Sequence, residues 1–235
     1  MTKFVAIVSG KGGTGKTTSA LNLAHALVSQ GHSTTVVDGD LATPNIASSL
    51  GLIQPKHTLN HFLRKQKSLK EITYKHDSGI SLIPASPAFH DFQDTSLQNV
   101  RRLFNQLHDT ADFVLVDAPS GLSYSVHQIL KHVDDAIIVV NPTRSSMLDA
   151  LKTIKLAQQY DTMITGILVT KHRWGRHELS IPEIRGTLHY PIIGTIPAHR
   201  KVRKAEHHNQ PVSFLYPRSS PAKAYKYAAM HLTIQ

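Results

Sequence analysis

Short, almost wholly apolar runs alternate along the chain with longer segments in which apolar residues recur at helical spacing. The runs predict strands at residues 3–8, 33–38, 80–84, 113–117, 136–140, 164–169 and 192–196. The longer segments predict helices at residues 17–29, 96–107, 147–159 and 219–232. Strands without polar alternation are typical of a parallel sheet that is buried on both faces. The pattern therefore predicts an α/β fold, a doubly wound, mostly parallel sheet with helices on both faces in a three-layer sandwich.

Length and composition are consistent with a single folded unit. The chain has 235 residues, 40% of them hydrophobic, and no shift in composition divides it, so residues 1–235 are predicted to form one domain. The absence of Cys excludes disulfides and Cys-bound zinc or iron–sulfur clusters. The first apolar run is too short for a signal peptide, and no run approaches the roughly 18 apolar residues of a membrane span. We therefore expect a cytoplasmic protein.

A glycine-rich segment, SGKGGTGKTT, lies between the first predicted strand and the first predicted helix. Residues 10–17 match the phosphate-binding pattern G-x-x-x-x-G-K-[ST]. Glycines allow a tight turn whose backbone N–H groups converge on phosphate oxygens, and the following helix adds its positive dipole end. Lys16 is expected to reach the β- and γ-phosphates, and the Thr17 hydroxyl to ligate Mg²⁺. The predicted nucleotide-binding residues here are Gly12, Gly13, Thr14, Gly15, Lys16, Thr17 and Thr18.

Three acidic residues follow predicted strands, where a metal-assisted phosphoryl site requires carboxylates. Asp117 ends the strand in FVLVDAPSG and is expected to hold Mg²⁺ through water. Asp38 ends the strand in TTVVDGDLATPN and is a second candidate metal ligand, while Asp40 is placed to orient or activate an attacking water. The alternative for each of them is a strand-end cap or a turn former.

The segments KGGTGKTT, DGDLATPN and DAPSG together resemble the MinD/ParA family of deviant Walker A ATPases, and the MinD branch in particular. The resemblance implies a P-loop NTPase fold that binds ATP or ADP with Mg²⁺, with Lys11, Lys16 and Asp40 as catalytic residues. It also implies that Lys11 reaches across an ATP-dependent homodimer to the ATP of the partner, as an arginine finger does. ATP then favours the dimer and hydrolysis releases it. The alternative is that Lys11 serves its own loop.

Two segments depart from the family pattern at positions that form the adenine pocket in relatives. Lys171 and His172 stand where relatives usually carry Asn-Arg, and Ala198-His199 follow Pro197 where relatives tend to have Glu-Asp. We expect altered contacts to the base, with Pro197 still contributing to nucleotide binding through its backbone. Residues 170–177 are predicted to form a charged loop.

Positive charge is concentrated in three segments, at residues 64–70, 171–177 and 199–204, and the formal net charge is +10. These clusters are candidates for contact with DNA or an anionic membrane surface, and their alternative is solvated loop charge. The last predicted helix carries an apolar stripe of Ala222, Tyr225, Ala229 and Leu232, which we expect to pack on the domain rather than insert in lipid.

The resemblance implies a positional function for the ATPase cycle. The leading hypothesis is a MinD-like regulator that localises an unknown protein partner or responds to an activator, for example in placing the division site. Such a protein is expected to be cytoplasmic or peripheral at the membrane or nucleoid. The alternative is a ParA-type segregation factor with ATP-dependent, non-specific DNA binding. A third class comprises metabolic enzymes and metallocluster carriers with the same nucleotide-binding core. Within it, iron–sulfur carriers are disfavoured because the chain has no Cys.

Overall fold

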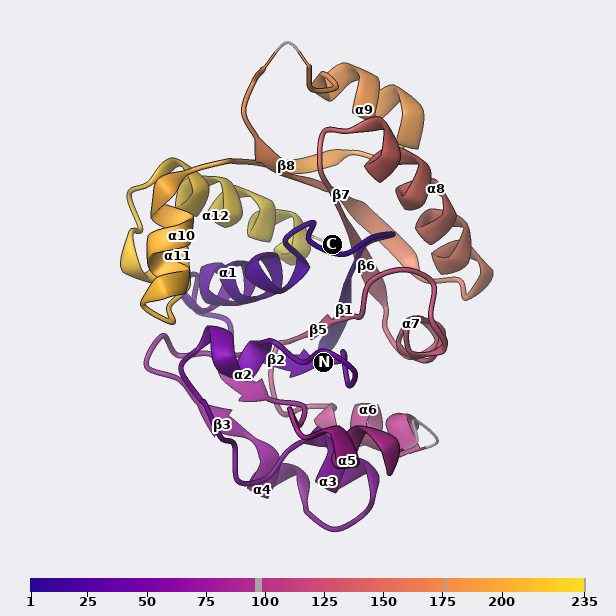
Figure 1. Cartoon of the computed structure of the whole chain (residues 1–235), viewed down its shortest axis with the longest axis vertical. Helices are drawn as coiled ribbons and strands as arrows, with labels where there is room; N and C mark the ends of the chain where they lie inside the picture. The colour runs from indigo at the N-terminus through magenta and orange to yellow at the C-terminus, as the bar shows by residue number, and fades with distance from the viewer. Residues whose placement is uncertain (96–98, 176, 235) are drawn as a thin grey trace.

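The computed structural model describes residues 1–95, 99–175 and 177–234, and within these ranges eight strands form one sheet (Figure 1). The order across the sheet is β3-β4-β2-β5-β1-β6-β7-β8; β3 and β4 are antiparallel, and all other neighbours are parallel. The predicted mostly parallel α/β fold is thus confirmed. The strands are β1 (Lys3–Val8), β2 (Thr34–Asp38), β3 (Tyr74–Lys75), β4 (Ser81–Ile83), β5 (Phe113–Asp117), β6 (Asp135–Val140), β7 (Met163–His172) and β8 (Ile192–Pro197).

Helices cover both faces of the sheet (Figure 1). On one face lie α1 (Lys16–Val28), α2 (Ile46–Ser49), α10 (Arg200–His207), α11 (Val212–Leu215) and α12 (Ser220–Thr233). On the other face lie α3 (Leu59–Leu63), α4 (Leu69–Ile72), α6 (Val100–Leu107), α7 (Tyr124–Leu130), α8 (Arg144–Gln159) and α9 (Ile181–Leu188), and α5 (Phe89–Gln93) lies beside α3. The apolar stripe predicted for the last helix is buried on the domain, as expected.

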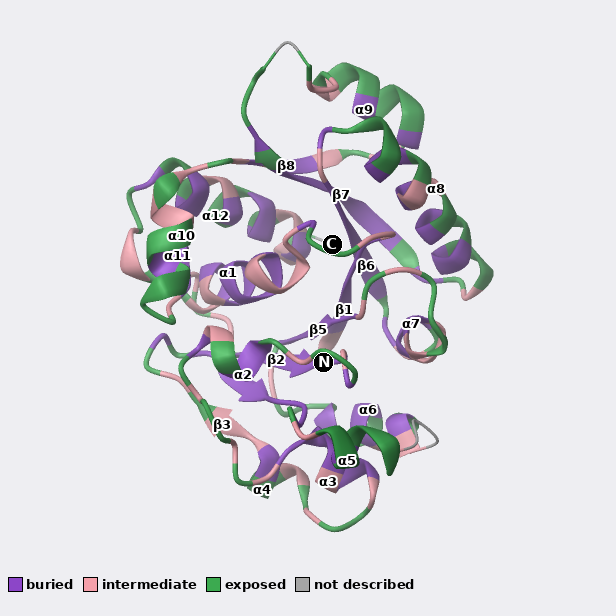
Figure 2. Cartoon of the chain, in the orientation of Figure 1, coloured by how far each residue is buried: buried purple, intermediate pink, exposed green. Residues whose placement is uncertain are grey.

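The central strand β1 shows why its sequence is apolar throughout. Phe4, Ala6 and Val8 pack into the core on one side of the sheet, while Val5 and Ile7 pack into the core on the other. All five are nearly or fully buried, and Figure 2 shows that the central strands are buried along their length. Each buried aliphatic side chain contributes about 2 kcal/mol to folding, so alternation with polar residues would be costly here.

Predicted and observed boundaries mostly agree within three residues, and two of the differences are informative. The predicted loop at residues 170–177 is wrong in its first part, because β7 continues through His172 and pairs with Pro197 of β8. The loop was predicted because these residues are polar. They nevertheless extend the strand beyond the core toward a cleft, because pairing with β8 outweighs their low intrinsic preference for a strand. The predicted helix at residues 96–107 begins at Val100 in the structure, and residues 96–98 lie outside the described residues.

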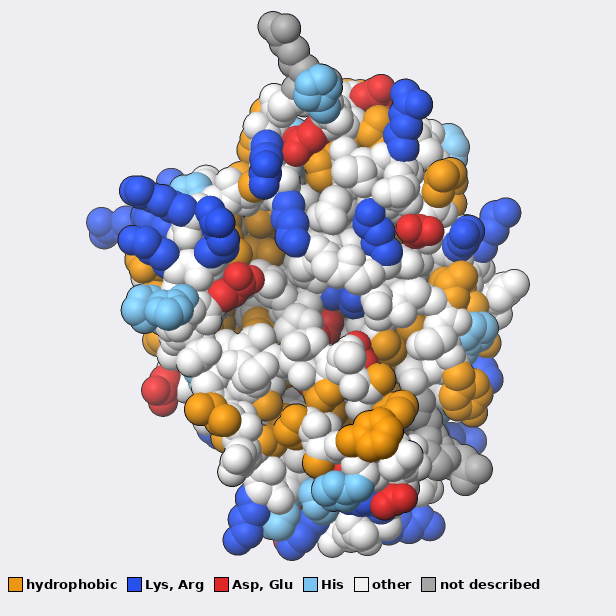
Figure 3. Space-filling view, in the orientation of Figure 1, with side chains coloured by type: hydrophobic (Ala, Val, Ile, Leu, Met, Phe, Trp, Pro, Cys, Tyr) orange, Lys and Arg blue, Asp and Glu red, His pale blue; other side chains and the backbone are white. Residues whose placement is uncertain are grey.

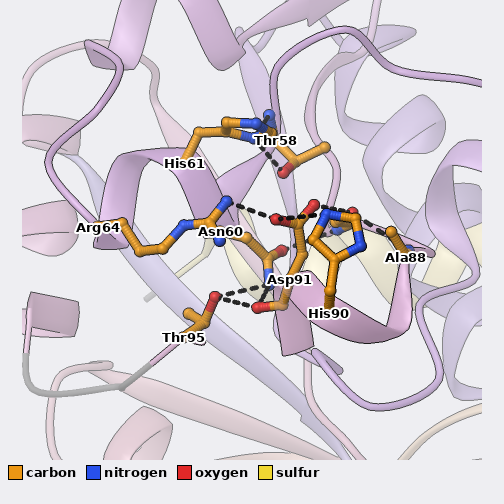
Figure 4. Close-up of polar contacts among 9 residues, drawn as sticks. Thr58, Asn60, His61, Arg64, Ala88, His90, Asp91 and Thr95 are labelled. Carbon is orange, nitrogen blue, oxygen red and sulfur yellow. Dashed lines mark hydrogen bonds and ion pairs between the residues drawn. The ribbon is translucent and has the colours of Figure 1, made fainter. Parts of the chain in front are cut away.

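A buried polar network fastens α5 to α3 (Figure 4). The Asp91 carboxylate lies 2.5 Å from Nη2 of Arg64 and accepts a hydrogen bond from Ser86 Oγ at 2.6 Å. Asn60 is fully buried; its Nδ2 donates to the Asp91 carbonyl at 3.2 Å, and its Oδ1 accepts from Ser86 N at 2.8 Å. Thr95 Oγ1 also donates to the Asp91 carbonyl. The network orders a segment of short helices that the hydrophobic pattern did not predict.

Candidate functional site: a phosphate-binding cleft

The glycine-rich segment forms a loop between β1 and α1 at the carboxyl edge of the sheet. Gly15, directly before α1, has φ 95°, a conformation that glycine adopts without strain. Gly10 is required for a different reason, because a Cβ atom there would lie 2.4 Å from the Cβ of Asp149 in α8. The loop therefore rests against α8 and presents its other side to the nucleotide, as the pattern predicts.

Neighbouring strands hold the loop by bonds to its carbonyl groups. Thr170 Oγ1 donates to the Thr14 carbonyl at 2.5 Å, and Asn141 Nδ2 donates to the same oxygen at 3.3 Å. Lys171 Nζ donates to the Gly13 carbonyl at 2.6 Å. Bonds to the carbonyl oxygens fix the loop while leaving its N–H groups for a ligand. Thr170 and Asn141 are not among the predicted site residues, since only their places near the carboxyl ends of β7 and β6 distinguish them.

A cleft of about 890 Å³ opens beside this loop. That volume lies in the range of nucleotide- and drug-sized sites. The cleft lies beside the carboxyl end of β1, between strands that connect to opposite sides of the sheet, where ligands of doubly wound folds bind. Its lining includes predicted site residues, namely Gly12, Gly13, Gly15, Lys16, Thr17, Thr18, Asp40, Asp117 and Pro197.

The centre of the cleft combines a lysine, a hydroxyl and a buried carboxylate. Thr17 Oγ1 donates to Asp117 Oδ2 at 2.5 Å. Burial raises the pKa of Asp117 to about 7, even though the Thr17 hydrogen bond and the Lys16 charge lower it. Burial also lowers the pKa of Lys16, against the attraction of Asp117 and Asp40. Burial therefore destabilises the charged forms of both Asp117 and Lys16, and the neighbouring groups offset this only in part.

The other oxygen of Asp117 is an orphan. Within the described ranges, Oδ1 of Asp117 is buried and has no hydrogen-bond partner. A buried carboxylate oxygen without a donor is costly unless a ligand completes its surroundings. Mg²⁺ prefers carboxylate, hydroxyl and water oxygens as ligands. Thr17 and Asp117 therefore fit the ion that the phosphate-loop pattern implies.

Asp38 and Asp40 both hold the loop that follows β2. Asp38 lies opposite Asp117 in the β2–β5 register, is fully buried, and accepts from the backbone N–H groups of Asn45 and Ile46, each at 3.1 Å. Burial raises the pKa of Asp38, and the nearby charge of Asp117 raises it further. Asp40 accepts from the N–H and the hydroxyl of Thr43, both at 2.9 Å. Their roles with metal and water therefore stay predictions.

Lys11 contacts a neighbouring helix of its own chain. Its Nζ donates to Ser145 Oγ, in the first turn of α8, at 3.0 Å. The bond joins two partly exposed side chains and is therefore weak. Lys11 is held by its own chain, with an ammonium group near the surface. The role that the resemblance implies for it in a dimer stays a prediction.

The two segments that depart from the family pattern meet where β7 pairs with the end of β8, on one side of the cleft. His172 is buried, and its Nδ1 accepts from the N–H of Trp174 at 2.9 Å, so it orders the turn after β7. His199 is the N-cap of α10, and its Nδ1 accepts from the N–H of Lys201 at 3.1 Å. Both histidines therefore have local structural partners, and Lys171 lines the cleft beside them.

The three basic clusters are placed differently. Arg200 and Arg203 from the cluster at 199–204, and Lys171 and Arg173 from the cluster at 171–177, line the cleft. Figure 3 shows Lys and Arg side chains gathered over α10. Residues 64–70 follow α3 and run into the start of α4, and none of them lines the cleft. Among the described residues, none of the helices is long and apolar enough to cross a membrane.

Comparisons with known proteins agree with this geometry. The family profile described as ParA, NUBPL iron-transfer P-loop NTPase, matches residues 1–233. An uncharacterized ATP-binding protein of Methanocaldococcus jannaschii is 34% identical over 220 residues, covering 94% of this chain and 83% of that protein. The Mg-ADP complex of the septum site-determining protein MinD of Pyrococcus horikoshii has a TM-score of 0.95 at 26% identity, covering 100% and 97% of the two chains. In the MinC:MinD cell division protein complex of Aquifex aeolicus, the matching chain has a TM-score of 0.89 at 25% identity, with 99% and 96% covered.

Proposed function

We propose that this chain, which belongs to the MinD/ParA family of P-loop NTPases, is an ATPase that controls the location of a partner by cycling between an ADP-bound monomer and an ATP-bound dimer. The chain is an ATP-binding protein of this family; hydrolysis, the dimer and the positional output are the proposal. The cycle is assigned to the cytoplasm or to a surface that faces it, such as the membrane or the nucleoid.

The proposal rests on Oδ1 of Asp117, a buried oxygen without a hydrogen-bond partner among the described residues, in the cleft beside Thr17 and Lys16. Thr17 and, through water, Asp117 would hold Mg²⁺, which would neutralise charge on the β- and γ-phosphates, with Asp38 as a further candidate behind them. Lys16 binds the phosphates. Asp40 lines the cleft and is assigned the orientation of the attacking water.

The dimer is proposed because the Lys11 ammonium group lies near the surface and, among the described residues, its side chain makes one weak hydrogen bond, to Ser145. Two bound ATP molecules at one interface concentrate negative charge, and a lysine supplied by each partner offsets it. The partner to be localised is unknown. The complex of a structural relative with MinC supports a protein partner, and the placement of the division site is the leading process.

A second candidate is ATP-dependent, non-specific DNA binding of the ParA type. It is favoured by the exposed basic side chains of α10, of which Arg200 and Arg203 reach the nucleotide cleft. Such binding would depend steeply on salt, because phosphate contacts release counterions. Anisotropy of labelled duplex DNA with the Asp40→Ala protein, in ATP and in ADP across a salt series, separates it from the leading function.

The proposal is tested by nucleotide binding and turnover in two variants. Lys16→Ala removes the phosphate contact and is expected to abolish binding of Mg-ATP, measured by calorimetry. Asp40→Ala is expected to bind ATP, hydrolyse it slowly and accumulate as a dimer. Lys155→Ala, on the exposed side of α8, is the control. Micromolar ATP affinity in Lys16→Ala would overturn the phosphate-loop assignment, and normal turnover in Asp40→Ala would remove Asp40 from the mechanism.

A further inference from the structure

The side of the cleft formed by the ends of β7 and β8 and by α10 has an unusual set of polar side chains. If the phosphates occupy the loop, the base must lie toward the ends of β7 and β8 and the start of α10. Lys171, Arg173, Arg200 and Arg203 line this side, together with His199 and Glu206. Ile196, Pro197 and Ala198 supply the apolar surface between them.

Nearly all of these polar groups are hydrogen-bond donors. Lysine and arginine side chains carry donors only. His199 Nδ1 accepts from Lys201 N at 3.1 Å, which places the ring proton on Nε2 and makes that nitrogen a donor as well. Thr170 also lines the cleft, but its hydroxyl is occupied, since it donates to the Thr14 carbonyl and accepts from Asn141 Nδ2.

The same side has one carboxylate acceptor, Glu206 of α10. Its Oε1 accepts from the hydroxyl of Thr18 at 2.9 Å, which leaves the other oxygen available. The side chain is exposed and lines the cleft. The donors of β7, β8 and α10 therefore share their side of the cavity with Glu206, while the other two carboxylates of the lining, Asp40 and Asp117, lie near Lys16.

This arrangement suits a guanine better than an adenine. Guanine presents two adjacent acceptors, O6 and N7, which Lys and Arg read, whereas adenine presents a donor, the N6 amino group, in place of O6. The N1–H and N2 amino groups of guanine are donors that a carboxylate accepts. A donor-only side chain facing the N6 amino group of adenine leaves both groups unpaired, which lowers affinity.

We propose that the cleft takes guanine nucleotides as well as adenine nucleotides, with Lys171 and Arg173 reading the O6 and N7 edge of the base. The inference rests on the proposed function, because it concerns the base of the nucleotide whose phosphates occupy the loop. Its consequence is an NTPase whose cycle responds to both purine nucleotide pools.

The test is calorimetric titration of the full chain with Mg²⁺ and slowly hydrolysed analogues of ATP, GTP and ITP. ITP keeps O6, N7 and N1–H but lacks the N2 amino group. GTP is expected to bind within about tenfold of ATP, and ITP to follow GTP, because the donors read O6 and N7. Lys171→Asn and Arg173→Gln supply an amide that can accept from N6 and are each expected to shift the GTP-to-ATP affinity ratio about tenfold toward ATP.

The control is Lys204→Asn, an exposed position of α10 that does not line the cleft, and it should leave the ratio unchanged. Because Lys171 also holds the Gly13 carbonyl, the readout is the ratio, in which a general loss of affinity cancels. ATP binding with GTP more than about a hundredfold weaker overturns the inference and leaves the proposed function intact. An unchanged ratio in both cleft variants also overturns it. Binding of neither nucleotide overturns the proposed function as well.

Discussion

The carboxylates of Asp91 and Asp117 are both buried, but their surroundings are opposite. Burial alone would raise the pKa of Asp91, yet hydrogen bonds from Ser86 and Arg64 and the charge of Arg64 bring it below the usual value. At Asp117, burial dominates and raises the pKa to about 7, and Oδ1 has no partner among the described residues. Neighbouring side chains satisfy both oxygens of the Asp91 carboxylate, whereas the Asp117 carboxylate keeps one oxygen that a ligand could contact.

The difference separates a carboxylate that the fold satisfies from one that we propose takes part in holding Mg²⁺. Around Asp91, the side chains of Asn60 in α3, of Arg64 directly after α3 and of Ser86 between β4 and α5 supply donors to its carboxylate and carbonyl oxygens (Figure 4). Around Asp117, the chain supplies one hydroxyl, from Thr17. Incomplete polar surroundings destabilise the free protein, and they are maintained where binding restores the balance.

The largest expected effect is on the stability of the Asp91 network. Asp91→Ala leaves the Arg64 guanidinium and Ser86 without their acceptor, and we expect a loss of about 4 kcal/mol in the free energy of unfolding. Urea denaturation measures it, with Asp94→Ala, an exposed neighbour, as the control. Nucleotide affinity should be unchanged under conditions where the variant is folded. A loss below about 1 kcal/mol would mean that the network is dispensable and that the contrast with Asp117 is overstated.

Asp117→Asn is expected to act in the opposite direction on the free protein. The folded pKa of Asp117 is raised, so its contribution to stability is fully present below the unfolded pKa and is lost as the pH rises from about 4 to about 7. Removing the charge should therefore stabilise the free protein by about 2 kcal/mol at pH 8, with little effect at pH 4.

Thermal and urea unfolding of the free Asp117→Asn protein at several pH values test this sign, with Asp77→Asn, an exposed aspartate, as the control. The same variant should bind Mg-ATP more weakly than the wild type, since the neutral amide is a poorer partner for the ion. If the variant is destabilised as much at pH 8 as at pH 4, the ionised Asp117 carboxylate does not destabilise the free protein. Asp117 would then stabilise the fold, as Asp91 does.

The two regions also differ in how far the sequence predicts them. Motif spacing predicts Lys16 and Thr17, because a phosphate loop needs its residues at fixed positions along the chain. The end of a predicted strand predicts Asp117, and the structure brings the three together in the cleft. Asn60, Arg64, Ser86 and Asp91 carry no such pattern. They come together only through the packing of short helices, in which tertiary contacts outweigh local propensity. For the same reason, polar residues near His172 were predicted as a loop although they extend β7.

The site residues that the sequence missed follow the same rule. Thr170 and Asn141 hold the carbonyl groups of the loop, and their function depends on which strands are neighbours in the sheet. Strand order is not encoded in local periodicity. Asp38 shows the reverse case: its position was predicted, but the structure adds that its carboxylate caps the loop before α2 through backbone N–H groups.

The smallest expected effect on stability concerns Lys11. Unlike Asp91 and Asp117, this charged group lies near the surface and is neither buried in the fold nor part of the cleft lining. Its bond to Ser145 joins exposed side chains, so Lys11→Ala and Ser145→Ala should each change the free energy of unfolding by less than about 0.5 kcal/mol. Sedimentation velocity with Mg²⁺ and a slowly hydrolysed ATP analogue should separate them. Lys11→Ala is expected to bind nucleotide and stay monomeric, because the interface then lacks the charge that offsets two triphosphates, whereas Ser145→Ala should still dimerise. Normal dimerisation of Lys11→Ala would mean that Lys11 serves its own loop and that its charge is not needed to balance the triphosphates at a dimer interface.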